Sequence, residues 1–292
     1  MLSVPISKSI VFKLSKSVLK KLQLLLNSLA LKRELLVQVT VLFSLLLVAA
    51  LVTVCRRRRR PLQLVGTSIP MIVHQVWVGS PLPAKYAKHI QSWKDRNPQF
   101  EHRLYDDTSA AALVRKHYPQ HLAVYLSLDR PVQRADMLRY MAIHQHGGFY
   151  ADMDTTCLKP LRKLCGHSCV VGSEILDHKG RPKQFLQWFF GAAPQHPLML
   201  AVLDEIGWRM RDPKIRTMHP DMRVLHTTGP QAFTDAVRKT MKQHPGSIKI
   251  FDPCSFGMYN MHLWKKCEKK AYLKHHFEGE WKMHWPDHLK NY

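Results

Sequence analysis

The stretch "RADMLRYMAIHQHGGFYADMDTTCLKPL", residues 134–161, joins a helical pattern to a short apolar strand that ends in two aspartates. From Pro131 onward, apolar residues recur at three- and four-residue steps, which predicts a long helix that a glycine pair ends. The letters "FYADMD" then predict a strand over 149–153, with Asp152 and Asp154 at its carboxyl end. A chain of this length contains about one Asp-x-Asp by chance. The pair is therefore informative only through its setting.

The residues before this stretch predict strands that alternate with helices. The expected elements are a buried strand in 69–79 ("IPMIVHQVWVG"), a helix over 84–96, a strand over 100–106 and a helix over 108–117. Such alternation predicts an α/β layered domain with a mainly parallel sheet flanked by helices. Ligands of such sheets bind beyond the carboxyl ends of the strands. The two aspartates therefore lie at the expected ligand-binding edge.

The spacing of Asp152 and Asp154 suits a hard cation. Side chains two residues apart on a strand point to the same side, so both carboxylates can face one ion. Mg²⁺ and Mn²⁺ prefer oxygen ligands and commonly bridge protein carboxylates to substrate phosphates. The pattern fits a metal-bound diphosphate, and its alternative is a pair of polar residues on the solvated side of an ordinary strand.

Two further features near the expected site have both a functional and a structural interpretation. Asp136 and Arg139 are three residues apart on the predicted helix and share a face. They either offer an acceptor and a donor to a bound ligand or form an ion pair on a solvated surface. Trp77, at the end of the first strand, is either a core aromatic residue or a platform on which a nucleotide base stacks.

The first 68 residues differ in composition from the rest of the chain. Residues 1–60 hold six Lys and six Arg against Glu34, yet no charged residue occurs over 35–55. This predicts a basic amphipathic segment over 1–34, a transmembrane helix over 35–55, and a basic juxtamembrane stem over 56–68 that begins with five arginines. The alternatives are a mitochondrial presequence and a buried helix of a soluble domain. The positive charges on the two sides of the span balance, so the charge pattern leaves the orientation open.

The remaining residues, 69–292, are long enough for one globular domain with a sizeable core. Six cysteines occur in the chain, and their spacing fits no common zinc module. In an oxidising compartment Cys254 with Cys267, or Cys165 with Cys169, are candidate pairs. The net charge of +23 also suits a non-catalytic basic module, but no Lys/Arg run after residue 61 has the interleaved aromatics of a nucleic-acid-binding face. We therefore expect no nucleic-acid partner.

Taken in order, "IPMIVHQVWVG", "SWKDRNPQFEHRLYDD" and the stretch at 134–161 resemble glycosyltransferase family 32, the DXD-containing sugar transferases. This family includes the fungal initiating α-1,6-mannosyltransferase and the inositol phosphoceramide mannosyltransferases. The similarity extends from about residue 69 to residue 281. It implies a GT-A-type nucleotide-sugar-binding domain behind a membrane anchor.

The resemblance also implies roles for particular residues. Asp152 and Asp154 would bind Mn²⁺ (or Mg²⁺) that bridges the diphosphate of the donor. Asp136 and Arg139 would contact the donor sugar, and Trp77 would stack on the base. Arg134 matches the family's basic residue before the Ala-Asp pair, and it is counted with the donor-binding residues.

Near the carboxyl terminus, "HHFEGEW" (275–281) resembles the closing His-His-x-x-Gly-Ser-Trp element of the family. There a histidine and a tryptophan reach the metal–phosphate site from a loop. The corresponding residues here are expected to be His276, as a metal ligand, and Trp281. The family's serine is Glu280 in this chain, which leaves open whether Glu280 binds the metal or the loop closes differently.

The activity that the resemblance implies is a retaining transfer of a hexose, most simply mannose from GDP-mannose, to inositol phosphoceramide. A protein-linked glycan is the alternative acceptor. The resemblance further implies a single-pass type II protein of the Golgi or ER–Golgi membrane with residues 61–292 in the lumen, although the arginines that follow the span argue against this orientation. It identifies no partner subunit.

Overall fold

The computed structural model describes residues 16–58, 68–257 and 261–279. Contacts divide the chain into two compact units, Met1–Pro61 and Leu62–Tyr292, and each is described separately.

Where the structure describes the first unit, the chain forms one continuous helix, α1, Lys16–Arg58. It covers residues 16–34 of the predicted amphipathic segment and the whole predicted span, without a break between them. Residues 1–15 of that segment lie outside the described residues. Among the residues that the structure describes, no helix is both long enough and apolar enough to cross a membrane.

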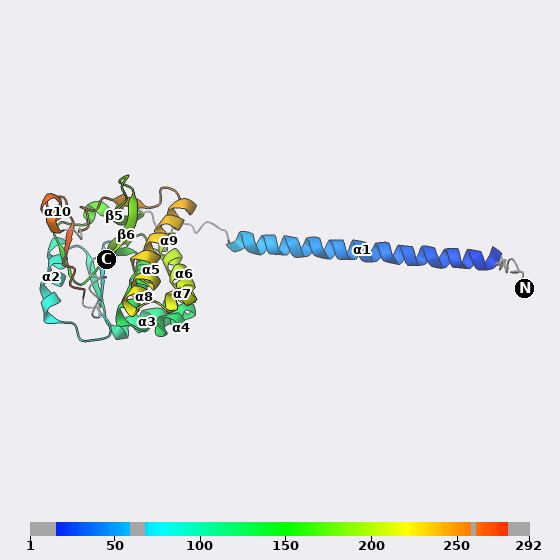
Figure 1. Cartoon of the computed structure of the whole chain (residues 1–292), viewed down its shortest axis with the longest axis horizontal. Coiled ribbons are helices and arrows are strands. Elements are labelled where there is room, and N and C mark those ends of the chain that lie inside the picture. The colour runs from blue at the N-terminus through cyan, green and yellow to red at the C-terminus, as the bar shows by residue number, and fades with distance from the viewer. Residues whose placement is uncertain (1–15, 59–67, 258–260, 280–292) are drawn as a thin grey trace, which may run out of the picture. The chain divides into compact units, whose positions relative to one another are not determined.

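The second unit is built on a six-stranded sheet (Figure 1). Across the sheet the strands are β2 (Glu101–Tyr105), β1 (Ile72–Val76), β3 (Gly148–Ala151), β6 (Pro182–Ala192), β5 (Cys169–Leu176) and β7 (Lys249–Phe251). Strands β2, β1 and β3 are parallel, whereas β6 is antiparallel to both β3 and β5. The sheet is therefore mixed, and the expectation of a mainly parallel sheet needs correction. The physical reason is that β5 and β6 form a hairpin, which requires antiparallel pairing.

The helices before β3 lie where the sequence predicts them. A 3₁₀ turn, η1 (Ala84–Tyr86), continues into α2 (Ala87–Arg96), α3 covers Asp107–His117, and α5 covers Pro131–His146. The other helical segments are η2 (Pro119–His121), α4 (Leu122–Leu126), η3 (Arg162–Leu164), α6 (Pro197–Arg209), α7 (Pro213–Arg216), α8 (Pro220–Thr227), α9 (Pro230–Gln243) and α10 (Met261–Cys267).

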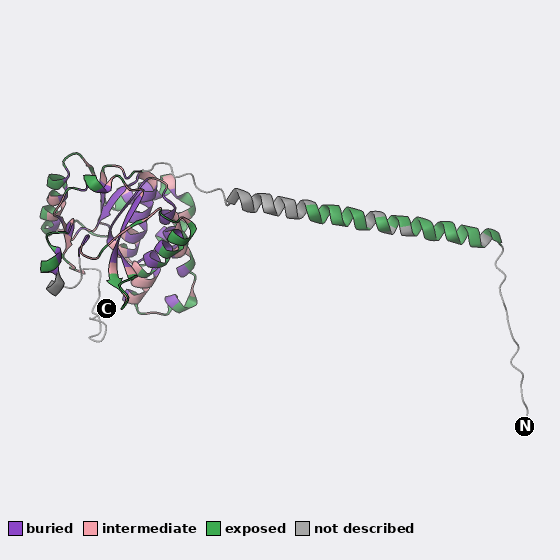
Figure 2. Cartoon of the chain, turned by 90° about the horizontal axis from the view of Figure 1, so that it is seen from above, coloured by how far each residue is buried: buried purple, intermediate pink, exposed green. Residues whose placement is uncertain are grey.

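Two apolar clusters cover the two faces of the sheet, and Figure 2 shows the buried residues concentrated along the strands and the helix faces that pack on them. The larger cluster joins α5, α6 and α9 to one face, where the rings of Tyr140 and Phe233 stack at 5.8 Å. The smaller cluster includes Trp93 of α2, Phe189 of β6 and Leu273 near the carboxyl terminus. Burial of these large side chains supplies most of the driving force that holds the layers together.

The turn between α5 and β3 depends on two glycines. Gly147 and Gly148 both have positive φ, 65° and 104°. A Cβ on Gly148 would lie 2.7 Å from the backbone oxygen of Ile72. Only glycine fits this conformation at this distance, so the pair allows β3 to begin directly beside β1.

A second, two-stranded sheet connects the DXD segment to the carboxyl-terminal region. Strands β4 (Thr155–Cys157) and β8 (Leu273–His275) pair antiparallel, with Thr155 opposite His275. A disulfide joins Cys254 to Cys267, one of the two expected pairings. The cysteines at 157, 165 and 169 are free thiols.

Candidate active site

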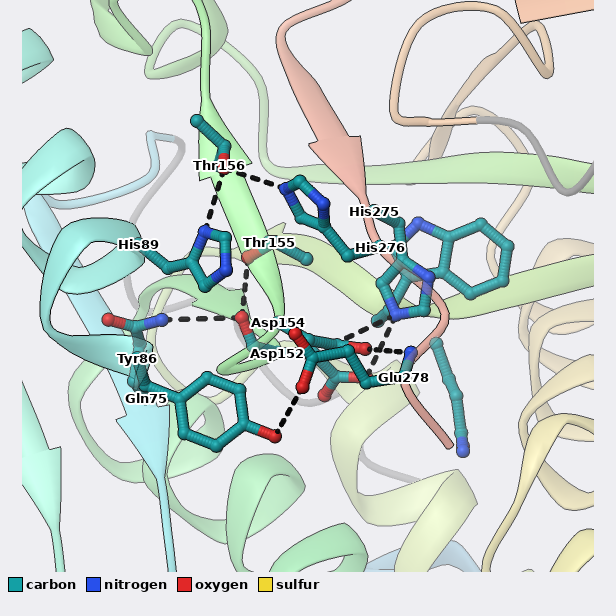
Figure 3. A network of polar contacts seen from close by, with 12 residues as sticks. Gln75, Tyr86, His89, Asp152, Asp154, Thr155, Thr156, His275, His276 and Glu278 are labelled. Atoms are coloured by element: carbon teal, nitrogen blue, oxygen red, sulfur yellow. Dashed lines mark hydrogen bonds and ion pairs between the residues drawn. The ribbon is translucent and has the colours of Figure 1, made fainter. Parts of the chain in front are cut away.

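Asp152 and Asp154 follow the last residue of β3, at the carboxyl edge of the sheet. The backbone N–H of Asp152 donates to the carbonyl of Trp188 at 2.9 Å, which continues the β3–β6 ladder by one residue. The backbone N–H of His276 donates to the Asp154 carbonyl at 2.9 Å, and that of Glu278 donates to Asp154 Oδ2 at 3.0 Å. The carboxyl-terminal segment therefore lies directly against the DXD loop (Figure 3).

His275 brings a third ligand-type side chain to the two aspartates. Its Nε2 lies 3.2 Å from Asp154 Oδ1 and 3.8 Å from Asp152 Oδ2. One ligand atom from each of the three residues falls within 4.8 Å of the others. The imidazole stacks on Trp188 with a centroid distance of 4.8 Å. Burial disfavours the charged imidazole, but its hydrogen bonds to the two carboxylates outweigh this and raise the pKa of His275 to about 9.

The predicted ligand His276 lies elsewhere. Its Nε2 is 2.9 Å from the Thr156 hydroxyl, and its ring lies 4.5 Å from that of His89 (Figure 3). The geometry thus favours His275 over His276 as the histidine beside the two aspartates. Asp152, Asp154 and His275, three candidate ligands of one metal ion, are called the metal cluster below. Strand alternation contains a signal for this choice, because His275 and the fully buried Leu273 are two residues apart on β8 and share a side.

Asp136 and Arg139 form a buried ion pair, not a pair on a solvated surface. Arg139 Nη2 lies 2.6 Å from Asp136 Oδ1, and the residues are 1% and 4% exposed. The hydroxyl of Thr228 donates to Asp136 Oδ2 at 2.6 Å. Burial raises the pKa of Asp136 to about 6, although the charge of Arg139 and the hydrogen bond from Thr228 act in the opposite direction.

Arg139 also connects this pair to the DXD motif. Its Nη1 lies 3.1 Å from Asp152 Oδ1 and donates to the carbonyl of Gln187 at 3.1 Å, while its guanidinium lies 4.4 Å from the centroid of the Tyr150 ring. Tyr150 itself donates to Asp152 Oδ1 at 2.5 Å. Arg139, itself held by Asp136, and Tyr150 therefore hold the first carboxylate of the motif in one orientation.

Sequence reasoning missed several residues that line or support the site. Tyr150 orients Asp152, Thr228 holds Asp136, and Trp188 supports His275. Gln75 donates to the backbone carbonyl of Asp152 at 3.3 Å. Tyr150 was accessible to sequence reasoning, since it stands two residues before Asp152 on the same strand and hence on the same side.

The other predicted residues are not brought to this cluster. Trp77 is half-buried, donates to the carbonyl of Pro81 at 3.2 Å, and packs against Tyr86 at 5.1 Å. Arg134 is half-buried and donates to the carbonyl of Leu128 at 3.2 Å. Glu280 and Trp281 lie outside the described residues.

The loop after β8 does reach the site from the other side. Glu278 forms an ion pair with Lys85 at 2.5 Å and accepts a hydrogen bond from the Tyr86 hydroxyl at 3.1 Å (Figure 3). Because the backbone of Glu278 also contacts Asp154, this loop links the η1 segment to the DXD motif. Trp77 lies beside Tyr86, which places it next to the same loop.

The three side chains at this edge fit a divalent cation of the Mn²⁺ or Mg²⁺ type. Two carboxylates supply hard oxygen ligands, and an imidazole nitrogen is accepted by Mn²⁺. Ligation requires His275 to be neutral. A metal ion held by these three side chains would keep further coordination positions for other ligands. A site that also binds a substrate phosphate needs such free positions.

Comparison with known proteins agrees with this chemistry. Residues 83–171 match the family model described as "Glycosyltransferase sugar-binding region containing DXD motif". The chain is 28% identical over 200 residues to mannosyl phosphorylinositol ceramide synthase of Saccharomyces cerevisiae, a match that covers 66% of this chain and 50% of the relative. It is 26% identical over 255 residues to the initiation-specific alpha-1,6-mannosyltransferase of Schizosaccharomyces pombe, with coverages of 73% and 64%.

These relatives are matched over only part of their length. The chain spans 50% of the first, 64% of the second, and 44% of inositol phosphoceramide mannosyltransferase 3 of Schizosaccharomyces pombe, to which it is 28% identical. Among solved structures, the PaToxG glycosyltransferase superposes with a TM-score of 0.48 at 18% identity, covering 62% of this chain and 72% of that one.

The matched family region contains α5, the two glycines and both aspartates of the motif, whereas His275 and Trp188 lie outside it. The similarity to fungal mannosyltransferases extends beyond this region on both sides. The chain thus contains a region that matches the DXD-containing sugar-binding region of glycosyltransferases, and it is similar to fungal mannosyltransferases of the family 32 type.

Proposed function

We propose that this protein is a metal-dependent, retaining mannosyltransferase with a GT-A-type catalytic domain and GDP-mannose as its donor. The observation that carries the proposal is the convergence of Asp152, Asp154 and His275 at the carboxyl edge of β3, beside the buried Asp136–Arg139 pair. This combination supplies a cation site and fixed positive charge at the place where ligands of such sheets bind.

Asp152, Asp154 and His275 would hold the metal, here Mn²⁺ or Mg²⁺. When bound, such an ion neutralises the charge that develops on a departing diphosphate. Arg139, fixed by Asp136 and stacked on Tyr150, adds a permanent positive charge next to Asp152. Preorganised charge of this kind stabilises a transition state without reorganisation during the reaction.

The acceptor hydroxyl attacks the anomeric carbon, forms the new glycosidic bond and loses its proton, while the bond to the nucleoside diphosphate breaks. Retention of configuration requires either a covalent intermediate or attack on the face from which the diphosphate leaves. In the described site Asp136 is buried and held by Thr228 and Arg139, and Asp152 is held by Tyr150 and Arg139. We therefore assign same-face attack, with the departing phosphate as the proton acceptor.

The names of three relatives describe the transfer of mannose. One of these names gives inositol phosphoceramide as the acceptor, and another gives mannosyl phosphorylinositol ceramide as the product. We propose inositol phosphoceramide as the acceptor here, with mannose from GDP-mannose as the transferred sugar. A protein-linked glycan is the second candidate, because an initiation-specific alpha-1,6-mannosyltransferase matches a larger share of this chain.

We further propose that residues 35–55 anchor the protein in the Golgi membrane with residues 61–292 in the lumen. The absence of charge over 35–55 supports the anchor, and the Cys254–Cys267 disulfide supports an oxidising compartment. Protease digestion of sealed microsomes tests the orientation. Protection of the carboxyl-terminal domain is expected, and its digestion without detergent contradicts the type II assignment.

The catalytic proposal is tested with the full chain purified in detergent. We expect Mn²⁺-dependent hydrolysis of radiolabelled GDP-mannose, and faster consumption of the donor when inositol phosphoceramide is added in mixed micelles. UDP-glucose serves as the matched control donor. Equal use of the two donors contradicts the assignment to mannose, and hydrolysis that chelation of the metal leaves unchanged contradicts metal dependence.

A further inference from the structure

The β5–β6 hairpin extends past the DXD motif. Strand β6 pairs with β3 through residues 189–192, so its earlier residues continue beyond the carboxyl end of β3. Trp188, the first of these, stacks on His275. Gln184 lies four residues before Trp188 in the sequence, farther from β3 along the hairpin, beyond a register shift in the pairing of β6 with β5. The hairpin therefore forms a wall that starts at the metal cluster and leads away from it.

Three polar side chains meet on this wall. Gln184 Nε2 donates to Glu174 Oε2 at 2.8 Å, and Gln231 Nε2, from the first turn of α9, donates to Gln184 Oε1 at 3.3 Å. The result is a row of one carboxylate and two amides. Groups of these types, in short rows, suit a ligand that offers several hydroxyl groups, since each carboxylate and amide oxygen accepts from a hydroxyl.

Neighbouring contacts hold the backbone beneath this row. The Thr234 hydroxyl of α9 accepts a hydrogen bond from the N–H of Phe185 at 3.0 Å, and Arg238 donates to the carbonyl of Lys183 at 2.7 Å. These hydrogen bonds give partners to backbone groups of β6 along the part of its edge that β3 does not cover. They fix the residues on both sides of Gln184, so the position of its amide is preorganised.

Glu174 is a half-buried carboxylate without a cation beside it. Among residues 16–58, 68–257 and 261–279, no basic side chain forms an ion pair with Glu174. Gln184 is its one hydrogen-bond donor among these residues and binds Oε2, so Oε1 has no partner among them. A carboxylate removed from water is costly unless its oxygens accept hydrogen bonds. Burial raises the pKa of Glu174 to about 7, although the hydrogen bond from Gln184 and the charge of His275 oppose the shift.

We propose that Glu174 and Gln184 form the acceptor subsite and bind hydroxyl groups of a polyhydroxylated acceptor, a sugar or a cyclitol, on the β5–β6 side of the metal cluster. Glu174 Oε1 accepts from one acceptor hydroxyl, and the Gln184 amide serves a neighbouring one. This inference rests on the proposed glycosyl transfer and adds to it the residues that select the acceptor. Glu174 is here a binding residue and takes no proton in the reaction.

Donor hydrolysis and transfer separate the two claims, because water replaces the acceptor in hydrolysis. In full-length Glu174→Ala protein we expect Mn²⁺-dependent hydrolysis of GDP-mannose within about twofold of the wild type. The KM for the acceptor should rise by at least about tenfold, the effect of losing a hydrogen bond to a charged group. Inositol phosphoceramide micelles and methyl α-mannoside are the two acceptor probes, and the one that wild-type protein uses identifies the source of the hydroxyls.

Glu174→Gln preserves size and an acceptor oxygen, and it should raise the acceptor KM less than Glu174→Ala does. If the alanine variant fails to fold, the acceptor KM of Glu174→Gln is compared with that of the wild type instead. Gln184→Ala should resemble Glu174→Ala, whereas Ile175→Ala, an exposed residue beside Glu174 on the same strand, should match the wild type.

An unchanged acceptor KM in folded Glu174→Ala and Gln184→Ala proteins overturns the subsite. So does an equal fall in hydrolysis and transfer, which indicates a role in the donor site or in folding. Absence of donor hydrolysis in the wild type itself overturns the proposed function, and the subsite with it.

Discussion

At the scale of single residues, the site is organised around the orientation of two carboxylates. Asp152 is held by Tyr150 and Arg139, whereas Asp154 is held by His275 and by the backbone of the loop after β8. The two halves of the motif are thus fixed by different parts of the chain. This division explains how a carboxyl-terminal segment more than 120 residues away contributes to a site that begins at β3.

The adjacent histidines provide a prediction with an internal control. Because His275 and not His276 faces both aspartates, His275→Ala should reduce Mn²⁺-dependent donor hydrolysis by at least about 100-fold, the upper range found for residues that merely support a metal ligand. His276→Ala removes contacts with Thr156 and should cost less than about tenfold. Initial rates at saturating Mn²⁺, with circular dichroism to confirm folding, measure both. The reverse order of the two losses would show that the loop binds the metal through His276.

At the scale of elements, the α5–β3 turn determines where the motif lies. The helix ends at His146, two glycines follow, and the strand that leads to Asp152 begins without any further loop. The antiparallel pairing of β3 with β6 then brings Trp188 beside the first aspartate. The position of the metal cluster is therefore set by a short turn and one strand register.

Gly148→Ala should destabilise the protein by about 2–4 kcal/mol, because it adds positive-φ strain to a contact of 2.7 Å with the backbone oxygen of Ile72. Two substitutions separate these causes. Gly180→Ala has the positive φ but no atom within 4 Å, so it should cost only about 1–2 kcal/mol.

Gly207 lies in α6, and a Cβ added there would meet no atom within 4 Å, so Gly207→Ala should stabilise the protein by up to about 1 kcal/mol. Urea unfolding of the three variants measures the differences. A loss for Gly148→Ala no larger than that for Gly180→Ala would exclude the close contact as a cause.

At the scale of the whole molecule, local patterns predicted most of the elements before β3 but not the pairing between distant ones. Helix periodicity and the glycine pair are local signals, and η1 with α2, α3, α5 and β2 lie within about two residues of their predicted bounds. The antiparallel partner of β3 is a strand that begins 28 residues after Asp154, and no local pattern encodes that choice. His275 has a local signal in its two-residue spacing from Leu273, but its contact with the aspartates depends on how β8 pairs with β4.

The sequence predicted the Asp136–Arg139 pair by spacing, but it did not establish burial. Burial follows from Thr228, which covers Asp136 from the segment before α9, and from the packing of Arg139 over Tyr150. Both contacts join residues from different elements. The expected roles of Trp77, Arg134, Glu280 and Trp281 stay predictions.

The whole domain should lose stability as the pH falls from 6.5 to 5. Burial lowers the pKa of four histidines, to about 3 for one and about 4 for the others, which are His74, His102, His144 and His196. Near pH 6.5 these histidines bind protons in the unfolded chain but stay neutral in the folded protein. The free energy of unfolding therefore falls by about 1.4 kcal/mol per pH unit for each additional proton that the unfolded chain binds.

Three groups act in the opposite direction, because their pKa values are raised, to about 6 for Asp136, about 7 for Glu174 and about 9 for His275. They are outnumbered by the four histidines, and a net loss of stability remains. Urea unfolding at several pH values measures the slope. A free energy of unfolding that is constant or rises between pH 6.5 and 5 would contradict the burial of neutral histidines in the folded state.

The central claim is that Asp152 and Asp154 hold a catalytic metal, and it is tested most directly by measuring Mn²⁺ binding and donor hydrolysis on the same preparations of wild-type, Asp152→Ala and Asp154→Ala proteins. Electron paramagnetic resonance of free Mn²⁺ in the presence of GDP gives the bound fraction without reference to activity. We expect one bound Mn²⁺ per wild-type chain, and in both variants the loss of that binding together with Mn²⁺-dependent hydrolysis of GDP-mannose. Normal Mn²⁺ binding and hydrolysis in either folded variant would contradict the account.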